Sequence, residues 1–366
     1  MATIYAEAVL AQETKVVQAD GSVLGGPVYY IKKAFTGKFG KFLAVFFAIA
    51  TTLALGFMGS MVQSNSIANA ISTAIPAVDG KIVSMTVGIV LALLCAFIFI
   101  GGIKRIASVA EKVVPLMAIV YIVLGLIVLG VNITKIPETF GMIFKFAFVP
   151  QALIGGAFGS ALKAAISQGA KRGLFSNEAG MGSTPHAHAQ ADVEKPHDQG
   201  VAAMIGVFVD TFIVLTMTAL VVICTLYTEG GPLAQFSTIN ADAAASIGIN
   251  KNNAMQVAMG QVFGTTAGSI LVALCLTFFA FTTIIGWNFF GKQNVEYLFG
   301  KKATVVYSVI AIVFIFLGTV FKSDLVWELT DFFNYLMVLP NVIALFALSA
   351  IVVTAVKSRK KKNDIE

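Results

Sequence analysis

The sequence predicts an all-α, polytopic membrane protein, and three observations carry that prediction. Hydrophobic residues make up 57% of the chain and charged residues only 12%, about half of what soluble domains carry. The 30 Phe outnumber the 19 Asp and Glu together, so much of the folded surface must face lipid. The apolar residues also come in long runs, and a helix needs about 20 of them to cross roughly 30 Å of hydrocarbon.

Eight apolar runs are long enough to cross a bilayer. A ninth, residues 1–11, is apolar and helix-prone but too short to cross, and it is expected to be the end of a helix that begins upstream. No linker or second domain interrupts the series, so residues 1–366 are expected to form one transmembrane domain. The eight predicted spans are 42–71, 82–102, 113–133, 146–168, 200–227, 258–290, 303–321 and 325–356.

The distribution of Lys and Arg predicts the orientation of these spans. If the loop 12–41 lies in the cytoplasm, alternation places 20 of the 25 Lys and Arg on the cytoplasmic side. The basic tail 357–366 is then cytoplasmic and lies near anionic lipid. The positive-inside bias explains the net charge of +6 better than a nucleic-acid partner does, so no nucleic acid is expected.

One predicted span contains several helix breakers. Span 146–168 carries Pro150 and then Gly155, Gly156 and Gly159. Each Gly costs about 1 kcal/mol in a helix interior. The cluster indicates either a helix broken near the membrane midplane, as in many transporters, or close helix packing through small residues.

Polar side chains inside the spans give a second signal, because they tend to face cavities. Gln63 belongs to a polar stripe in span 42–71. Thr282 and Thr283 lie in span 258–290, and Trp287 follows Thr283 by one turn on the same helix face. A threonine hydroxyl there could bind Na⁺, or it could simply donate to its own i−4 carbonyl. Trp287 could line a pocket or anchor the helix at the membrane interface.

Ionisable groups inside the spans are a third signal. Asp210 lies about three turns into span 200–227, where an ion site and a structural pairing are equally plausible. Glu328 and Asp331 open the last span, and their position near a helix start favours a structural role. Glu7 could belong with these groups, but its helix is incomplete. No nucleophile–base pair or metal cluster indicates an enzyme, and no metal beyond Na⁺ and no organic cofactor is expected.

The segment Arg172–Ser183, RGLFSNEAGMGS, resembles the most distinctive stretch of the sodium:alanine (alanine or glycine:cation) symporter family. Pro196 and the pair Gln199–Gly200 follow it as they do in that family. The resemblance extends over essentially the whole chain. Three further stretches agree with it: Tyr5–Ala11 with Gly25–Ile31, Gly59–Ala68, and Gly101–Pro115.

This resemblance implies a core of ten helices in two inverted five-helix repeats, and cell-membrane uptake of L-alanine or glycine by alternating access, driven by Na⁺ or H⁺. Span 146–168 would be the broken helix 6, and Asn177, Glu178 and Asp210 would serve as gate or packing residues. Na⁺ would bind at Thr282 or Thr283. The residues expected to bind substrate are Gln63, Gly155, Gly156, Phe158, Thr283 and Trp287.

The chain departs from the family pattern at its start. Core helix 1, with the family's Gly-Thr-Gly-Asn break, and most of helix 2 have no counterpart upstream of Met1. The sequence therefore predicts an N-terminally truncated member that does not transport on its own. The alternative is a non-transporting remnant or an assembly partner of a split transporter.

Overall fold

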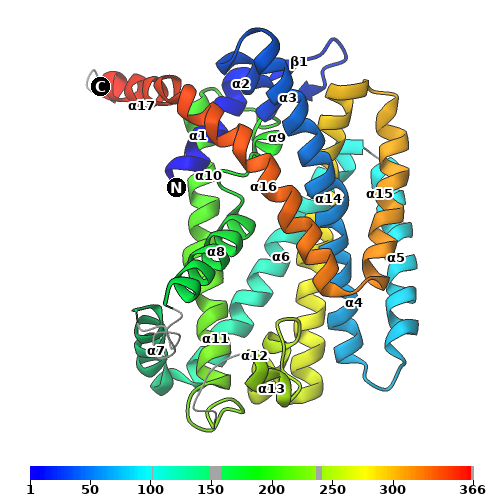
Figure 1. The fold of residues 1–366 in the computed structure, drawn as a ribbon, viewed down its shortest axis with the longest axis vertical. Helices are drawn as coiled ribbons and strands as arrows, with labels where there is room; N and C mark the ends of the chain where they lie inside the picture. The colour runs from blue at the N-terminus through cyan, green and yellow to red at the C-terminus, as the bar shows by residue number, and fades with distance from the viewer. Residues whose placement is uncertain (101, 149–157, 236–240, 364–366) are drawn as a thin grey trace.

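A computed structural model describes residues 1–100, 102–148, 158–235 and 241–363. It is 82% helical, which confirms the all-α prediction. The helices form an elongated bundle (Figure 1). Seven helical stretches in the described residues are long and apolar enough to cross a membrane: Gly37–Ala74, Gly80–Phe99, Arg105–Val131, Pro196–Leu226, Thr265–Phe299, Ala303–Val320 and Ser323–Ala347.

Nearly all of the described secondary structure is helical. In the part of the chain that the structure describes, one antiparallel pair, β1 (Val16–Val17) and β2 (Val23–Leu24), follows the first helix. The helices are α1 (Ala2–Thr14), α2 (Pro27–Ala34), α3 (Gly37–Thr51), η1 (Thr52–Gly59), α4 (Ser60–Ala74), α5 (Gly80–Ile100), α6 (Gly102–Val131), η2 (Ile133–Lys135), α7 (Ile136–Phe148), α8 (Phe158–Asn177), α9 (Pro185–His188), α10 (Pro196–Phe208), η4 (Val209–Leu215), α11 (Thr216–Leu226), α12 (Ala241–Ser246), α13 (Ala254–Phe263), α14 (Thr265–Phe299), α15 (Ala303–Val320), α16 (Ser323–Ala347) and α17 (Ser349–Asn363).

Seven of the eight predicted spans overlap these seven stretches. The eighth, 146–168, overlaps the end of α7 and the start of α8. Pro150, Gly155 and Gly156 lie outside the described residues, and so does the side chain of Phe158, which begins α8. The short segment 1–11 is helical, as predicted, within α1.

Two predicted boundaries were wrong. Span 258–290 was expected to be one helix, but Gly264 adopts a φ of 84°, which ends α13 and allows α14 to start in a new direction. Span 325–356 was expected to continue to Val356, but α16 ends at Ala347 and α17 begins two residues later. Apolar runs cross both junctions, so hydropathy alone did not reveal them.

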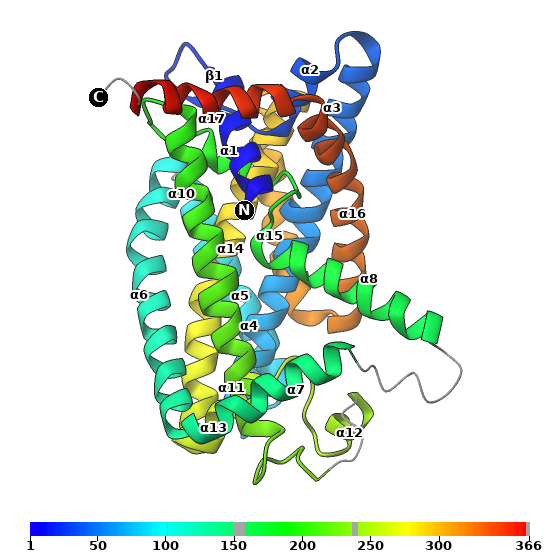
Figure 2. The same cartoon turned by 90° about the vertical axis from the view of Figure 1, so that its left-hand side faces the viewer.

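Figures 1 and 2 separate the two ends of the bundle. The helices α2 and α17 and the strand pair lie at one end, and α17 runs across the bundle there. The helices α7, α12 and α13 lie at the opposite end. The basic tail therefore lies at the same end as α2 and its neighbouring loops.

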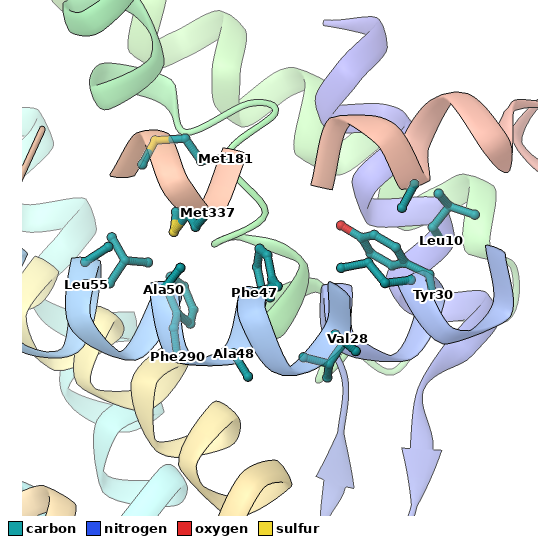
Figure 3. Close-up of a cluster of buried hydrophobic side chains, with 14 of the residues drawn as sticks. Leu10, Val28, Tyr30, Phe47, Ala48, Ala50, Leu55, Met181, Phe290 and Met337 are labelled. Carbon is teal, nitrogen blue, oxygen red and sulfur yellow. The ribbon is translucent and has the colours of Figure 1, made fainter. Parts of the chain in front are cut away.

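The main apolar core joins α3, η1 and α16 to the segment that follows α8. Phe47 and Leu55 are fully buried in it, beside Met337 of α16 and Met181. Figure 3 shows the sulfur-containing side chains of Met181 and Met337 close to one another over this cluster. The core thus packs around the residues between α8 and α9.

Candidate functional site

A non-helical segment interrupts the helical course of the chain between α8 and α9. The helix α8 ends at Asn177, and α9 begins at Pro185. Three residues between them have left-handed backbone: Glu178 at φ 57°, Gly180 at 95° and Gly182 at 83°. Figure 2 shows this segment inside the bundle, in front of α14. We call residues 178–184 the junction segment. Unpaired backbone here requires partners from other elements.

The carboxylate of Glu7 supplies those partners. Glu7 lies on α1 and its side chain is fully buried. One carboxylate oxygen accepts the backbone N–H of Gly180 at 2.9 Å, and the other accepts that of Gly182 at 2.9 Å. Glu7 thereby fixes the course of the junction segment from a helix more than 160 residues away in the sequence.

Asn341 of α16 completes this network. Its Nδ2 donates to Glu7 at 2.7 Å and to the carbonyl of Gly180 at 2.9 Å. Its Oδ1 accepts a hydrogen bond from the Tyr30 hydroxyl of α2. Four separate parts of the chain therefore meet at one buried polar centre, which is satisfied by charge-assisted bonds of the stronger kind.

Trp287 of α14 reaches the junction segment from the other side. Its indole Nε1 donates to Oε1 of Glu178 at 2.8 Å, and the residue is only 3% exposed. Phe175 packs edge-on against that ring at a centroid distance of 5.6 Å. Gly59, the last residue of η1, lies against the same ring, because a Cβ built there would sit 2.6 Å from the indole.

The end of α8 is also tied to the π-helical segment η4. Asp210 accepts a hydrogen bond from Ser176 at 3.1 Å, and Asn177 donates to the Thr211 hydroxyl at 3.2 Å. The three predicted gate or packing residues, Asn177, Glu178 and Asp210, thus lie at or beside the start of the junction segment. Segments of π-helix are frequent at functional sites.

His186 of α9 is buried and neutral. Burial lowers its pKa to about 4. Its Nδ1 lies 2.7 Å from the carbonyl of Ser183, and its Nε2 lies 2.8 Å from the amide of Asn294. The neutral ring therefore donates from Nδ1 and accepts at Nε2. Its role is to hold α9 against α14.

The two carboxyls of the site lie outside the seven candidate spans. Burial raises the pKa of Glu7 to about 7, although Gly180, Asn341 and Gly182 donate to it and act in the opposite direction. Burial also raises the pKa of Glu178, against the opposing effect of the neighbouring Ser183 hydroxyl and of Trp287. Burial therefore disfavours the charged form of both carboxyls.

An ion pair and two aromatic rings cover the site toward the start of α16. Arg172 bonds Asp331 at 3.0 Å and stacks over Trp327 at 4.6 Å. Trp327 packs against Phe175 at 5.2 Å. The sequence favoured a structural role for Asp331, and in the structure this residue forms an ion pair with Arg172 of α8.

The structure brings only some of the predicted site residues together. Trp287 and Glu178 are in direct contact, and Gln63 lies one turn beyond Gly59 on α4 and is partly buried. The Thr283 hydroxyl donates to the carbonyl of Phe279 at 2.9 Å, and that of Thr282 donates to the carbonyls of Phe278 and Phe279. The hydroxyl protons are occupied, while the oxygen lone pairs remain able to bind a cation.

Several site residues were not found from the sequence. The sequence alone assigns no role to Glu7 and does not single out Asn341, Met181 or Phe47. A buried carboxylate in an apolar helix was the available signal for Glu7. Asn341 carried a similar signal, because Pro340 precedes it in the middle of α16.

Comparison with known proteins decides the family. A sequence model of the sodium:alanine symporter family matches residues 1–365. The chain belongs to this family. Its relatives include the sodium/alanine symporter AgcS of Methanococcus maripaludis, 38% identical over 98% of this chain and 74% of AgcS.

Two relatives from Bacillus subtilis carry other names. The putative sodium/proton-dependent alanine carrier YrbD is 38% identical over the whole of this chain and 73% of its own length. The probable sodium/glutamine symporter GlnT is 36% identical over 99% of this chain and 70% of GlnT. The family consists of multi-pass membrane transporters of amino acids, coupled to a cation, and not of enzymes.

The contact between Gly59 and Trp287 gives a first prediction. Replacing Gly59 with Ala pushes a methyl group into the indole ring, and overpacking of this kind costs about 1–3 kcal/mol. We expect a lower midpoint of thermal unfolding and a red-shifted Trp emission. Gly286→Ala is the matched control, because a Cβ at Gly286 meets nothing within 4 Å. Equal behaviour of the two variants would contradict the contact.

Proposed function

We propose that this chain takes part in Na⁺-coupled symport of small neutral amino acids, with L-alanine and glycine as substrates, across the cell membrane. The observation that carries the proposal is the junction segment, a break in the helical backbone enclosed by α1, α14 and α16. Transporter sites are commonly built beside such a break in the helical course of the chain.

The surroundings of the junction segment favour a small substrate. Apolar side chains surround the segment, namely those of Trp287, Phe175 and Met181. The indole ring also leaves no room for a side chain at Gly59. We propose Gln63, Thr283 and Trp287 as substrate-contacting residues on the helices that face the segment. Gly155, Gly156 and Phe158 remain predicted substrate contacts from the family resemblance.

The coupling ion is proposed to be Na⁺, with H⁺ as the alternative. The name of AgcS refers to sodium, and that of YrbD to sodium or protons. Thr282 and Thr283 offer oxygen atoms to a hard cation from adjacent positions of α14.

Replacing Thr283 with Val tests this ion assignment. Valine keeps the shape of the side chain but removes the oxygen, so we expect the Na⁺ concentration for half-maximal L-alanine binding to rise by about ten-fold. Thr277→Val is the control, since its hydroxyl also donates to an i−4 carbonyl on α14. An unchanged Na⁺ dependence in the Thr283 variant would remove that residue from the ion site.

Equilibrium binding tests the function itself. The purified chain in nanodiscs is expected to bind labelled L-alanine in NaCl and to bind it at least about ten-fold more weakly in choline chloride, because the ion and the substrate are coupled. Equal L-alanine binding in the two salts would contradict Na⁺ as the coupling ion and would favour H⁺.

The expectation that the chain does not transport on its own remains a prediction, and liposomes test it. Labelled L-alanine uptake under an inward Na⁺ gradient would contradict that expectation. Binding without uptake would favour an assembly partner of a split transporter. The orientation with the C-terminus in the cytoplasm rests on the distribution of Lys and Arg, and cysteine labelling of the tail from each side of the membrane checks it.

A further inference from the structure

A cavity of about 590 Å³ lies beside the last turns of α14, at the end of the bundle that carries the strand pair (Figure 1). Its walls are the turn and second strand of that pair, the end of α14, Ile106 of α6 and Gln190 after α9. Pockets that hold small molecules commonly measure about 300–1,000 Å³. Among the described residues that line it, none belongs to the junction segment, so the cavity is separate from that site.

The strand pair is fixed in place as one wall of the cavity. Gln190 and Gln293 both donate from Nε2 to the carbonyl of Val23, at 2.9 and 3.1 Å. Lys301 forms an ion pair with Asp20, in the turn between the strands, at 2.5 Å. Side chains from three parts of the chain therefore hold this wall against α14.

One face of α14 presents three chemically different side chains to the cavity. Phe289, Lys292 and Glu296 all line it, and spacings of three and four residues place them on the same helix face. This face thus offers an aromatic ring, an ammonium group and a carboxylate in order along the helix.

The two charges on this face are not consumed by pairing. Lys292 and Glu296 lie one turn apart, but they form no ion pair, and Lys292 has no ion pair with any other residue that the structure describes. Glu296 accepts one long hydrogen bond, from Gln18 at 3.4 Å. Each charge can therefore bind an oppositely charged group of a ligand in the cavity.

The mixture of charges favours a ligand that carries both signs. An anion would meet Lys292 but also the carboxylates of Glu296 and Asp20, and a cation would meet Lys292 and Lys301. Like charges brought together disfavour binding. A zwitterion can place its carboxylate at Lys292 and its ammonium group at Glu296, with its side chain against Phe289.

We propose that this cavity is a second binding site for a small neutral amino acid. Lys292 binds the carboxylate, Glu296 binds the ammonium group, and Phe289 contacts the side chain. The inference rests on the proposed function, because it assigns the same class of amino acid to the cavity. The site lies at the end of the bundle for which the sequence predicts a cytoplasmic location, so it would receive the amino acid on its way out of the transporter.

Thiol labelling tests the site independently of Na⁺-coupled binding. Cys95, Cys224 and Cys275 are all buried, so a water-soluble maleimide reaches chiefly a cysteine introduced at Ser22, which is exposed and lines the cavity. The labelling rate of the chain in nanodiscs is measured in choline chloride with increasing L-alanine. We expect saturable slowing at Ser22→Cys and none at Ser349→Cys, an exposed position outside the cavity.

Charge-removing variants in the Ser22→Cys background test the assigned roles. In Lys292→Gln and in Glu296→Gln, we expect the L-alanine concentration for half-protection to rise at least about ten-fold, because each loses a bond to a charged group. Lys302→Gln is the matched control, since Lys302 is exposed and does not line the cavity. L-Alaninamide lacks the carboxylate and N-acetyl-L-alanine lacks the ammonium group, so each should protect at least about ten-fold more weakly than L-alanine.

Three results would overturn the proposed site: labelling that L-alanine does not slow, unchanged half-protection in Lys292→Gln or Glu296→Gln, or equal protection by inorganic phosphate, which would show a site for anions. None of them bears on the proposed function, which is measured separately by the Na⁺ dependence of L-alanine binding. If Ser22→Cys lowers the unfolding midpoint, Leu24→Cys repeats the measurement from the same wall.

Discussion

Replacing Glu7 with Gln is expected to destabilise the protein by about 3 kcal/mol or more and to abolish L-alanine binding. The carboxylate accepts three buried donors, the N–H groups of Gly180 and Gly182 and the amide of Asn341. Glutamine offers one oxygen and one NH₂ group, so one backbone N–H faces another donor. A hydrogen bond to a charged group contributes about 1.5–3 kcal/mol, and an orphaned buried donor costs about 1–3 kcal/mol.

Thermal unfolding in detergent and equilibrium binding measure this effect. Glu13→Gln is the matched control, because Glu13 lies on the same helix and is exposed. We expect Glu13→Gln to keep the unfolding midpoint and the L-alanine affinity of the parent chain. If Glu7→Gln retained the parent's unfolding midpoint and its L-alanine affinity, Glu7 would not be what positions the junction segment.

The second large effect is expected from Gly182→Ala. Gly182 has a φ of 83°, and a left-handed backbone costs a residue with a Cβ about 1–2 kcal/mol. The added Cβ would also lie 2.8 Å from the ring of Phe47 and 2.9 Å from Asn341, both of which are fully buried. Overpacking adds about 1–3 kcal/mol. A shift of the backbone at residue 182 would also weaken the hydrogen bond that its N–H donates to Glu7.

A second glycine separates the two contributions. Gly230 has a φ of 82°, but a Cβ there meets nothing within 4 Å. Gly230→Ala should therefore show only the backbone cost. We expect the unfolding free energy of Gly182→Ala to fall about 1–3 kcal/mol further than that of Gly230→Ala, and L-alanine binding to fall only in Gly182→Ala. Equal losses of stability in the two variants would contradict this expectation. They would show that Phe47 and Asn341 move aside without measurable cost.

The fold class and most helices could be predicted from the sequence, because the bilayer imposes a strong and local constraint on hydropathy. Seven of the eight predicted spans correspond to candidate membrane-crossing helices in the described residues. The errors fell where an apolar run continues past a turn, as at Gly264 and between Ala347 and Ser349. A change of backbone direction at one residue leaves no trace in a hydropathy average.

The candidate site was only partly predictable, because its contacts join distant parts of the chain. The sequence singles out Thr283 and Trp287 on one helix face, and the family resemblance implies a gate or packing role for Asn177, Glu178 and Asp210. The bonds from Glu7 to Gly180 and from Asn341 to Glu7 join α1, the junction segment and α16. Such pairings depend on tertiary packing, which a single sequence does not encode in its spacing.

One measurement tests the central claim, that this chain binds a small neutral amino acid together with Na⁺. Labelled L-alanine is titrated onto the purified chain in nanodiscs, once in NaCl and once in choline chloride at equal ionic strength. We predict saturable binding in NaCl, displaced by unlabelled glycine, and at least about ten-fold weaker binding in choline chloride. Equal binding in the two salts, or no saturable binding in NaCl, would contradict the claim.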